Sequence, residues 1–333
     1  MAQATNTTDT YDVASTGGNR EDLEDVIWEL FPEDTWALSN LDHVGADATL
    51  HEWLRDSLAA AASNAQIEGD DTDAAAITPP VRHGNYTQIL KKIFLITRTQ
   101  DKVSKAGRAT ESAREMMKEM RELKRDLEYA ITRNQIGTAG GSGTARTMAS
   151  MEAWIGGTAG ATTTATVVML STSTASSTTA AVTSGVPGTA IVDGTNTAAF
   201  TSAKLNLALQ AAWANGGDPR VILVGASQKT AVDSFTSVST RFVNTGRTEQ
   251  ATITGASNLY VSDYGTHQVV LHRYMRTSVA LNLDPDLWAV AFLDAPFSEE
   301  LAKTGDARKF HIVTEATLVA RNWTGNSKVV ALS

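Results

Sequence analysis

The clearest periodic pattern of apolar residues lies between residues 108 and 134. Six apolar residues recur there at alternating spacings of three and four, which places them in one narrow stripe on an α-helix: Ala113, Met116, Met120, Leu123, Leu127 and Ala130. Thirteen of the 27 residues in this range are charged, so the other helix faces suit water. The pattern predicts a helix over residues 108–134, about 40 Å long, lying along one side of a sheet.

Shorter apolar runs predict strands on both sides of this helix. Residues 89–97, ILKKIFLIT, form a nearly continuous run of strand length, which predicts a buried strand. Near the C-terminus, LWAVAFL (287–293) and the alternating FHIVTEATLVA (310–320) predict further strands. Between them, residues 198–235 show the patterns of a helix, a strand and a second helix, an order typical of a mixed α/β unit. The predicted fold class is therefore α+β.

The N-terminal part of the chain contains a weaker helical pattern. Residues 19–34, NREDLEDVIWELFPED, place four apolar residues on one face, with Asn19 as the N-cap and Pro32 as the stop. They predict a short amphipathic helix. The eighteen residues before it have no apolar pattern and predict a mobile arm.

Residues 45–88 are acidic and lack the apolar pattern of a core element. They contain seven acids against two bases, and no lysine. The segments TLHEWL (49–54) and VRHGNYTQI (81–89) predict the two arms of a long hairpin, with EGDDTD (68–73) near its tip. A two-stranded ribbon is marginal in water. We therefore expect this hairpin to lie against another surface.

Residues 158–190 form a Thr/Ala/Ser-rich tract with few charges. Threonine favours strand or extended chain, so the composition fits both a β insertion and a surface loop. Both interpretations stay open.

Composition narrows the functional classes. The 333 residues suffice for one large domain or two ordinary ones, and the net charge of −9 argues against a nucleic-acid binder held by a basic surface. The absence of cysteine excludes disulfides, thiolate zinc sites and cysteine nucleophiles. Neither a signal-peptide pattern nor an apolar run of about 18 residues is found. We therefore expect that the protein is made in the cytoplasm and does not associate with a membrane.

Two motifs resemble catalytic loops, and both have a simpler explanation. GTAGGSGTAR (137–146) lacks the lysine of a phosphate loop and follows a helix, which favours a flexible hinge. In VILVGASQK (221–229), Ser227 follows a strand as in a nucleophile elbow, but Lys229 stands where the second glycine belongs. A serine N-cap explains this position better.

Two groups of possible metal ligands also have simpler explanations. His267 and His272 are five residues apart in a strand pattern, so they face opposite sides and cannot share a metal. The tip acids depart from the calcium-loop pattern, because Arg82 stands at the twelfth position from Asp71. We predict no catalytic, cofactor or metal site, and hence no enzyme.

Several stretches, taken in order, resemble the major capsid proteins of one lineage of tailed bacteriophages, which share the HK97-type fold. Among them are NAQIEGDD (64–71), ELKRD (122–126), GGDPRVILVGASQKTAVDSF (216–235) and LAKTGDA (301–307). The resemblance extends from about residue 18 to the C-terminus. Trp36, at a position where relatives more often have proline, and the tract 158–190 depart from it.

The resemblance implies an HK97-like α+β fold and a division of the chain into domains. The implied ranges are the N-terminal arm 1–44, the projecting E-loop 45–88, the P-domain 89–136 with its spine helix 108–134, the A-domain 137–282 with the tract 158–190, and C-terminal strands 283–333 that complete the P-domain. In this fold the E-loop lies across the neighbouring subunit.

The resemblance also implies the function of a major capsid protein. Pentamers and hexamers would assemble in the host cytoplasm into the icosahedral shell of a virion, enclosing double-stranded DNA without sequence-specific binding. Some relatives cross-link their shells through an E-loop lysine; the lysine-free hairpin here predicts non-covalent contacts, with the acidic tip meeting basic groups on an adjacent subunit. The candidate intersubunit contacts are Trp53, Arg55, Glu68, Asp70, Asp71, Asp73 and Arg82.

Other partners follow from the same resemblance. An N-terminal arm of about forty-four residues has no room for a built-in scaffolding domain, so a separate scaffolding protein is implied. A portal is implied as well, and a decoration protein is compatible. Two alternatives remain: a fibre or adhesin-like protein, for which no internal repeat is found, and a serine hydrolase acting through Ser227.

Overall fold

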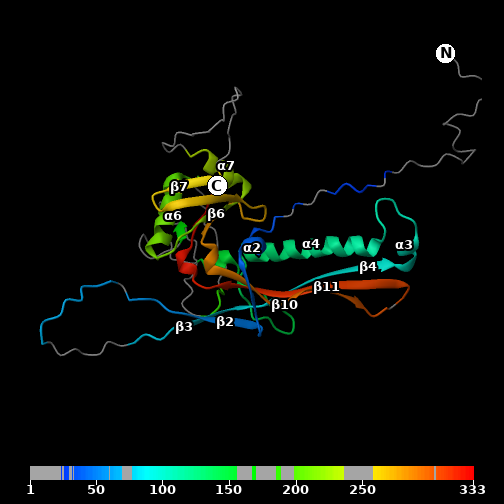
Figure 1. The fold of residues 1–333 in the computed structure, drawn as a ribbon, viewed down its shortest axis with the longest axis horizontal. Coiled ribbons are helices and arrows are strands. Elements are labelled where there is room, and N and C mark those ends of the chain that lie inside the picture. Colours follow the sequence, from blue (N-terminus) through cyan, green and yellow to red (C-terminus); the bar gives the residue numbers. More distant parts are fainter. Residues whose placement is uncertain are drawn as a thin grey trace, which may run out of the picture.

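The computed structural model describes residues 24, 26–29, 32, 34–59, 61–69, 77–155, 167–169, 185–188, 199–235, 258–303 and 305–333. The described chain forms an elongated body, a more compact body beside one end of it, and a projecting hairpin (Figure 1). The predicted mobile arm and most of the predicted tract 158–190 lie outside the described residues.

The elongated body is one helix on a four-stranded sheet. The strand order is β1 (Asp42–Gly45), β10 (Trp288–Leu301), β11 (Ala307–Ala320) and β4 (Gln88–Thr97). β1 runs parallel to β10, and the other neighbours are antiparallel. Helix α4 (Glu111–Thr132) lies along β4 and β11 (Figure 1). The two predicted C-terminal strands are therefore confirmed as the centre of this sheet.

The predicted long helix is confirmed, with 22 residues in place of 27. Its apolar stripe packs on the sheet: Leu123 is buried against Phe94 and Phe310, whose rings stack with centroids 5.1 Å apart. Leu127 and Ile131, nearer the C-terminal end, enter the main core. Burial of this stripe fixes α4 on the sheet, because helix stability in proteins comes mostly from packing.

The strand predicted as buried is buried on one side only. Phe94 and Ile96 of β4 pack towards α4, and Lys92 pairs with Asp126 of the helix at 2.9 Å. The alternate residues face away and are about half exposed, with fractions of 56%, 50% and 57% for Ile89, Ile93 and Leu95. The prediction of a fully buried strand was wrong, because α4 covers one face of the sheet and the described chain does not cover these residues on the other.

The compact body is built on a six-stranded sheet. Its strand order is β5 (Val167–Met169), β12 (Ser327–Val330), β9 (Ala280–Leu283), β6 (Val221–Val224), β8 (Gly265–Leu271) and β7 (Leu259–Ser262). The predicted helix, strand and helix over 198–235 are confirmed as α6 (Ser202–Ala214), β6 and α7 (Ala226–Asp233). β6 is fully buried at the centre of this sheet.

The last strand of the chain belongs to the compact body. β12 pairs antiparallel with β9 and parallel with β5. The range 283–333, predicted as a whole to complete the P-domain, is thus divided between the two sheets. β5 also places a short strand inside the tract 158–190, for which strand and loop were both open.

The remaining elements are short. They are α2 (Trp36–Asn40), β2 (Leu50–Arg55), β3 (Val81–Tyr86), α3 (Arg98–Lys102), α5 (Met151–Trp154), η2 (Pro285–Leu287) and η3 (Trp323–Gly325). β2 and β3 form a separate two-stranded sheet, the base of the projecting hairpin.

The helix predicted over residues 19–34 is not formed at residues 26–29, which have no helical assignment. Of the predicted apolar face, Val26 is 52% exposed and Ile27 is partly buried beside Gly107, so the described part of this face is only partly covered. Glu29 is held instead by an ion pair with Arg114 of α4, at 2.8 Å.

Candidate intersubunit surface

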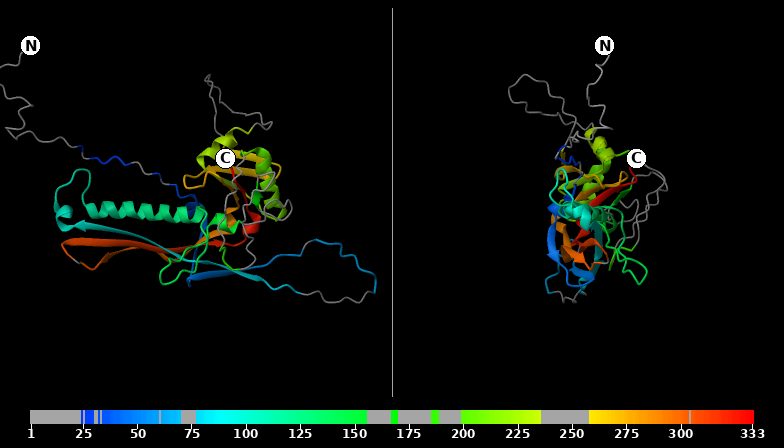
Figure 2. Two further views of the ribbon diagram at one scale, coloured as in Figure 1. Left: turned by 180° about the vertical axis from the view of Figure 1, so that it is seen from behind. Right: turned by 90° about the vertical axis from the view of Figure 1, so that its right-hand side faces the viewer.

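The hairpin predicted from residues 45–88 is present, with the predicted arms. β2 and β3 pair antiparallel in the register Leu50 to Tyr86 and Arg55 to Val81. Pairing ends there, and the chain continues outward to a turn at Glu68 and Gly69, where the glycine adopts φ +82°. Figures 1 and 2 show the loop projecting beyond the bodies, with the hairpin and α4 on opposite sides of the four-stranded sheet.

An aromatic cluster anchors the base of the hairpin to its own chain. The Trp53 ring of β2 lies 5.4 Å from that of Trp154, which is fully buried and 4.9 Å from Trp323. His83 of β3 makes an edge contact with Trp323 at 4.6 Å. The expectation that the ribbon must lie on another surface is confirmed for its base, and that surface is intramolecular.

The two arginines of the hairpin have different environments. The Arg55 guanidinium lies over the Trp323 ring, 4.7 Å from its centroid, and donates to the Thr324 hydroxyl at 3.3 Å. Burial lowers the pKa of Arg55. Arg82 is largely exposed and lies 3.7 Å from Glu52, a surface pair of little energetic weight.

Asn85 holds the middle of β3 and was not found by sequence reasoning. This fully buried amide accepts from the Ala149 N–H at 2.7 Å and donates to the carbonyls of Ala149 and Leu318, at 2.9 and 2.8 Å. The available signal was an asparagine within a strand pattern, where this residue type is depleted. These bonds fix β3 to β11 and to the chain before α5.

A polar contact fixes the corner between β3 and β4. Arg146 pairs with Glu315 of β11 and donates to the Thr87 carbonyl at 2.6 Å. The segment predicted as a flexible hinge is a tight turn, because the backbones of Thr138 and Thr147 bond to each other. The hairpin therefore leaves the body at a fixed position.

The described residues of the outer hairpin, 56–59, 61–69 and 77–80, lack such anchoring. Leu58, Ile67 and Ile77 are 98%, 81% and 94% exposed, and Glu68 is also exposed. The other predicted tip residues, Asp70, Asp71 and Asp73, lie outside the described residues. Of the seven candidate contacts, the structure thus places Trp53 and Arg55 against the chain's own body, and Glu68 and Arg82 in solvent.

A second anchoring site, also missed by sequence reasoning, is centred on Glu128 of α4. Its fully buried carboxylate accepts hydrogen bonds from the backbone N–H groups of Ala37 and Leu38, at 2.8 and 3.1 Å, and lies 2.9 Å from His272 Nε2. Nearby, the Tyr274 hydroxyl donates to the Pro32 carbonyl at 3.1 Å. The available signal was a carboxylate among the apolar residues of the last helical turns.

The sequence matches the family described as SU10 major capsid protein over residues 3–333. The chain belongs to the SU10 major capsid protein family. The major capsid protein of Escherichia phage Phieco32 is 30% identical over 122 residues, 36% of this chain and 35% of the relative. The alignment thus spans about a third of that relative's length.

Solved structures show the same fold as this SU10-family chain. A chain of the capsid of a native GTA particle has a TM-score of 0.64 at 12% identity, covering 99% of this chain and 100% of that one. A chain from the structure described as Phage G gp27 major capsid proteins and gp26 decoration proteins has a TM-score of 0.55 at 12% identity, with both chains fully covered. The predicted resemblance to phage major capsid proteins, and the predicted HK97-like α+β fold, are confirmed.

The side chains considered as catalytic residues or metal ligands, Ser227, His267 and His272, have separate environments in this SU10-family fold. Ser227 is the second residue of α7 and exposed; Gly225 occupies the N-cap, so the predicted serine cap was wrong by two positions. His267 bonds the Pro219 carbonyl, whereas His272 contacts Glu128. In the described ranges, no three histidine or acidic residues group as metal ligands, and no helix is long and apolar enough to cross a membrane.

The hairpin base predicts a pH dependence of stability. Burial lowers the pKa of His83, and the positive charge of Arg55 lowers it further. Between the unfolded value of about 6.5 and the lower folded value, the unfolded chain binds more protons, so the free energy of unfolding falls as the pH falls. We expect urea titrations to show this slope below about pH 6.5 and a shallower one for His83→Gln. Equal slopes for the wild type and His83→Gln would contradict this.

Proposed function

We propose that this chain forms pentamers and hexamers that assemble in the bacterial cytoplasm into the icosahedral shell of a virion enclosing double-stranded DNA. One observation carries the proposal: a hairpin is locked to its own subunit at the base and exposes Leu58, Ile67 and Ile77 along its outer half. Exposed apolar side chains on a projection that is fixed at its base favour a protein contact. A neighbouring copy supplies that contact in a closed symmetric shell.

The proposed domains follow the fold. Residues 1–44 are the N-terminal arm, residues 45–88 the E-loop, and residues 89–136 the P-domain with α4 as its spine. Residues 137–282 are the A-domain. The strand pairing supports one refinement: β10 and β11 complete the P-domain, and β12 joins the A-domain sheet.

The open face of the four-stranded sheet is the proposed surface that receives the hairpin. Ile89, Ile93 and Leu95 are about half exposed there, on the face away from α4. The exposed Lys91 alternates with them and offers a cation to an acidic segment. The hairpin also projects on the side away from α4 (Figure 2), so a flat arrangement of subunits would bring these surfaces together.

The proposed contacts are non-covalent, because residues 45–88 contain no lysine. Weak contacts suffice, since closed symmetry engages many of them at once. A separate scaffolding protein and a portal complete the proposed assembly, and the shell is compatible with a decoration protein. Mature particles should dissociate to single chains on a denaturing gel, whereas a covalent ladder would contradict this.

Removing charge at the hairpin tip is expected to weaken assembly and leave folding intact. The double variant Asp70→Asn/Asp71→Asn loses two surface charges at each contact. At low salt, this loss should raise about fivefold the protein concentration that is needed for particles to form. The matched control Asp47→Asn/Asp56→Asn removes two charges nearer the hairpin base and should assemble as the wild type does. Sedimentation at several salt concentrations measures both. Equal losses in the two variants would point to net charge alone and contradict a specific tip contact.

A further inference from the structure

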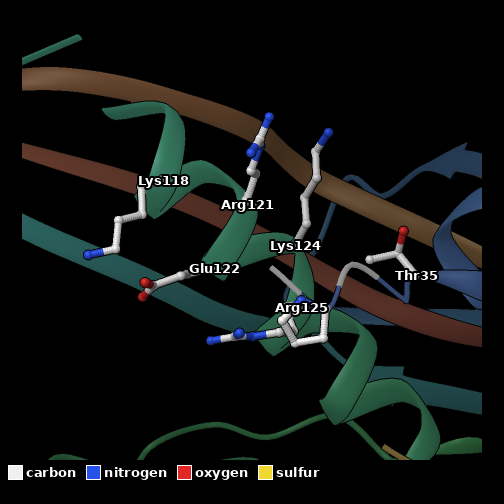
Figure 3. A pocket seen from close by; sticks show the side chains of 7 residues that line it. Thr35, Lys118, Arg121, Glu122, Lys124 and Arg125 are labelled. Atoms are coloured by element: carbon white, nitrogen blue, oxygen red, sulfur yellow. The ribbon is translucent and has the colours of Figure 1, made fainter. Parts of the chain in front are cut away.

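A cationic hollow lies on the side of α4 away from the sheet, where the N-terminal chain crosses the helix. It has a volume of about 300 Å³ and is lined by Pro32, Thr35, Lys118, Arg121, Glu122, Lys124 and Arg125. Figure 3 shows Lys118, Glu122 and Arg125 projecting to one side of the helix, and Arg121 and Lys124 to the other. We propose that this hollow binds an acidic segment of a partner protein.

The charge balance of the hollow carries the first step. The described residues that line it include four cations and one carboxylate, although the chain as a whole has a net charge of −9. Lys118 already pairs with Glu115 at 3.7 Å, and Arg121 has an interaction of its own. The Glu122 carboxylate is already engaged by Lys92, at 3.4 Å. In the described part of the chain, Lys124 and Arg125 form no ion pair with a carboxylate, whereas Arg114 on the same helix has three. Lys124 and Arg125 are therefore the two cations that can receive negative charge in the described part of the hollow.

The adjacent hollow shows how α4 binds an acidic segment. It has a volume of about 460 Å³ and lies between residues 26–29 and the helix. The Glu29 carboxylate accepts a hydrogen bond from Arg114 at 2.8 Å, and Ile27 lies over Gly107 at the rim. One carboxylate and one apolar side chain of the N-terminal chain are thus bound by this helix face already. A similar segment suits the next hollow along the helix.

The chemistry favours peptide over nucleic acid. Glu122 lines the hollow, and Glu115 and Glu119 lie on the same helix, so a phosphate backbone would meet carboxylates that it cannot hydrogen-bond. A peptide carries backbone N–H donors for such carboxylates, and Pro32 provides an apolar wall. The hairpin tip of a flat-lying neighbour is not the favoured occupant, because hairpin and α4 lie on opposite sides of the sheet (Figure 2). A separate protein fits better.

The test uses the purified full-length chain and a fluorescent, end-blocked ten-residue peptide with four glutamates among leucine and alanine. Anisotropy should show binding that fails with glutamine in place of glutamate. Lys124→Gln/Arg125→Gln should weaken binding at least fivefold, because two charge contacts are lost. Lys102→Gln/Lys303→Gln removes the same charge at exposed sites away from the hollow and should change binding less than twofold.

Two outcomes would overturn the proposal. The first is equal peptide binding by the hollow variant and the wild type, with circular dichroism showing both folded. The second concerns a single-stranded oligonucleotide of equal charge. If it bound more tightly than the peptide, and if the hollow variant no longer bound it, the hollow would be a phosphate site. A photoreactive peptide gives a second readout on the unchanged chain. Cross-links that avoid Pro32, Thr35 and residues 118–125 would also overturn the assignment. The inference does not rest on shell formation, since binding is measured on unassembled protein.

Discussion

Trp154→Ala is expected to lower the free energy of unfolding by about 3–5 kcal/mol, the usual cost of truncating a large core aromatic residue. The Trp154 side chain is fully buried and contacts the rings of Trp53, His83 and Trp323. Its loss removes the centre of the cluster that anchors β2 and β3. Urea unfolding measures the stability, and hydrogen exchange of the hairpin amides should show that the base loosens at denaturant concentrations where the sheets remain folded.

Trp154→Phe is the matched control for this prediction. The Trp154 indole N–H has no hydrogen-bond partner among the described residues, so replacing indole by phenyl also removes an unsatisfied donor. We expect a loss of only about 1–2 kcal/mol, mostly from the reduced volume. If Trp154→Ala left both stability and hairpin exchange unchanged, the cluster would not be the anchor.

Glu128→Gln is expected to lower the free energy of unfolding by about 2–3 kcal/mol. The carboxylate accepts from the N–H groups of Ala37 and Leu38 and contacts His272 Nε2. An amide has one acceptor oxygen, so its NH₂ group would face at least one donor in this buried site. Urea unfolding measures the loss, and the amides of Ala37 and Leu38 should lose most of their protection from hydrogen exchange.

Glu119→Gln is the control for Glu128→Gln. It makes the same chemical change on the same helix, where burial and the neighbouring Glu122 raise the pKa of the Glu119 carboxyl. Removing this charge should change stability by less than about 0.5 kcal/mol. Equal effects of the two variants would mean that Glu128 acts through helix charge alone and does not hold the N-terminal chain.

Local patterns in the sequence predicted the elements in which regularly spaced residues make the same kind of contact. The stripe containing Leu123 and Leu127 predicted α4 because helix periodicity brings those residues to the sheet. The hairpin arms were predicted because turn-forming and acidic residues separate two strand-like runs. The prediction that residues 89–97 form a fully buried strand was wrong for one face. A continuous apolar run has the same sequence pattern whether one or both faces of the strand are covered by the same chain.

The anchoring residues could not be predicted from local pattern. Asn85 and Glu128 are polar residues whose partners lie between 64 and 233 positions away along the chain. Such pairings are set by tertiary structure, and a single sequence shows only an unexpected polar residue in an apolar segment. Residues 26–29 failed as a helix for a related reason, because the amphipathic pattern does not show whether a surface is present to bury Val26.

The described chain presents different chemistry on its two sides. On one side, the open sheet face exposes Ile89, Ile93 and Leu95, and the hairpin projects with its apolar and acidic outer half. On the other side, α4 exposes cations beside an acidic N-terminal chain. A subunit that contacts its neighbours through one side and a separate partner through the other fits the proposed shell.

Electron microscopy across a sedimentation gradient tests the central claim most directly. The full-length chain would be expressed alone and together with the proposed scaffolding protein. We expect closed shells, tubes, or rings of five and six subunits in at least one of these samples. A chain that stayed monomeric in both, at every concentration, would contradict the proposal that it builds a shell.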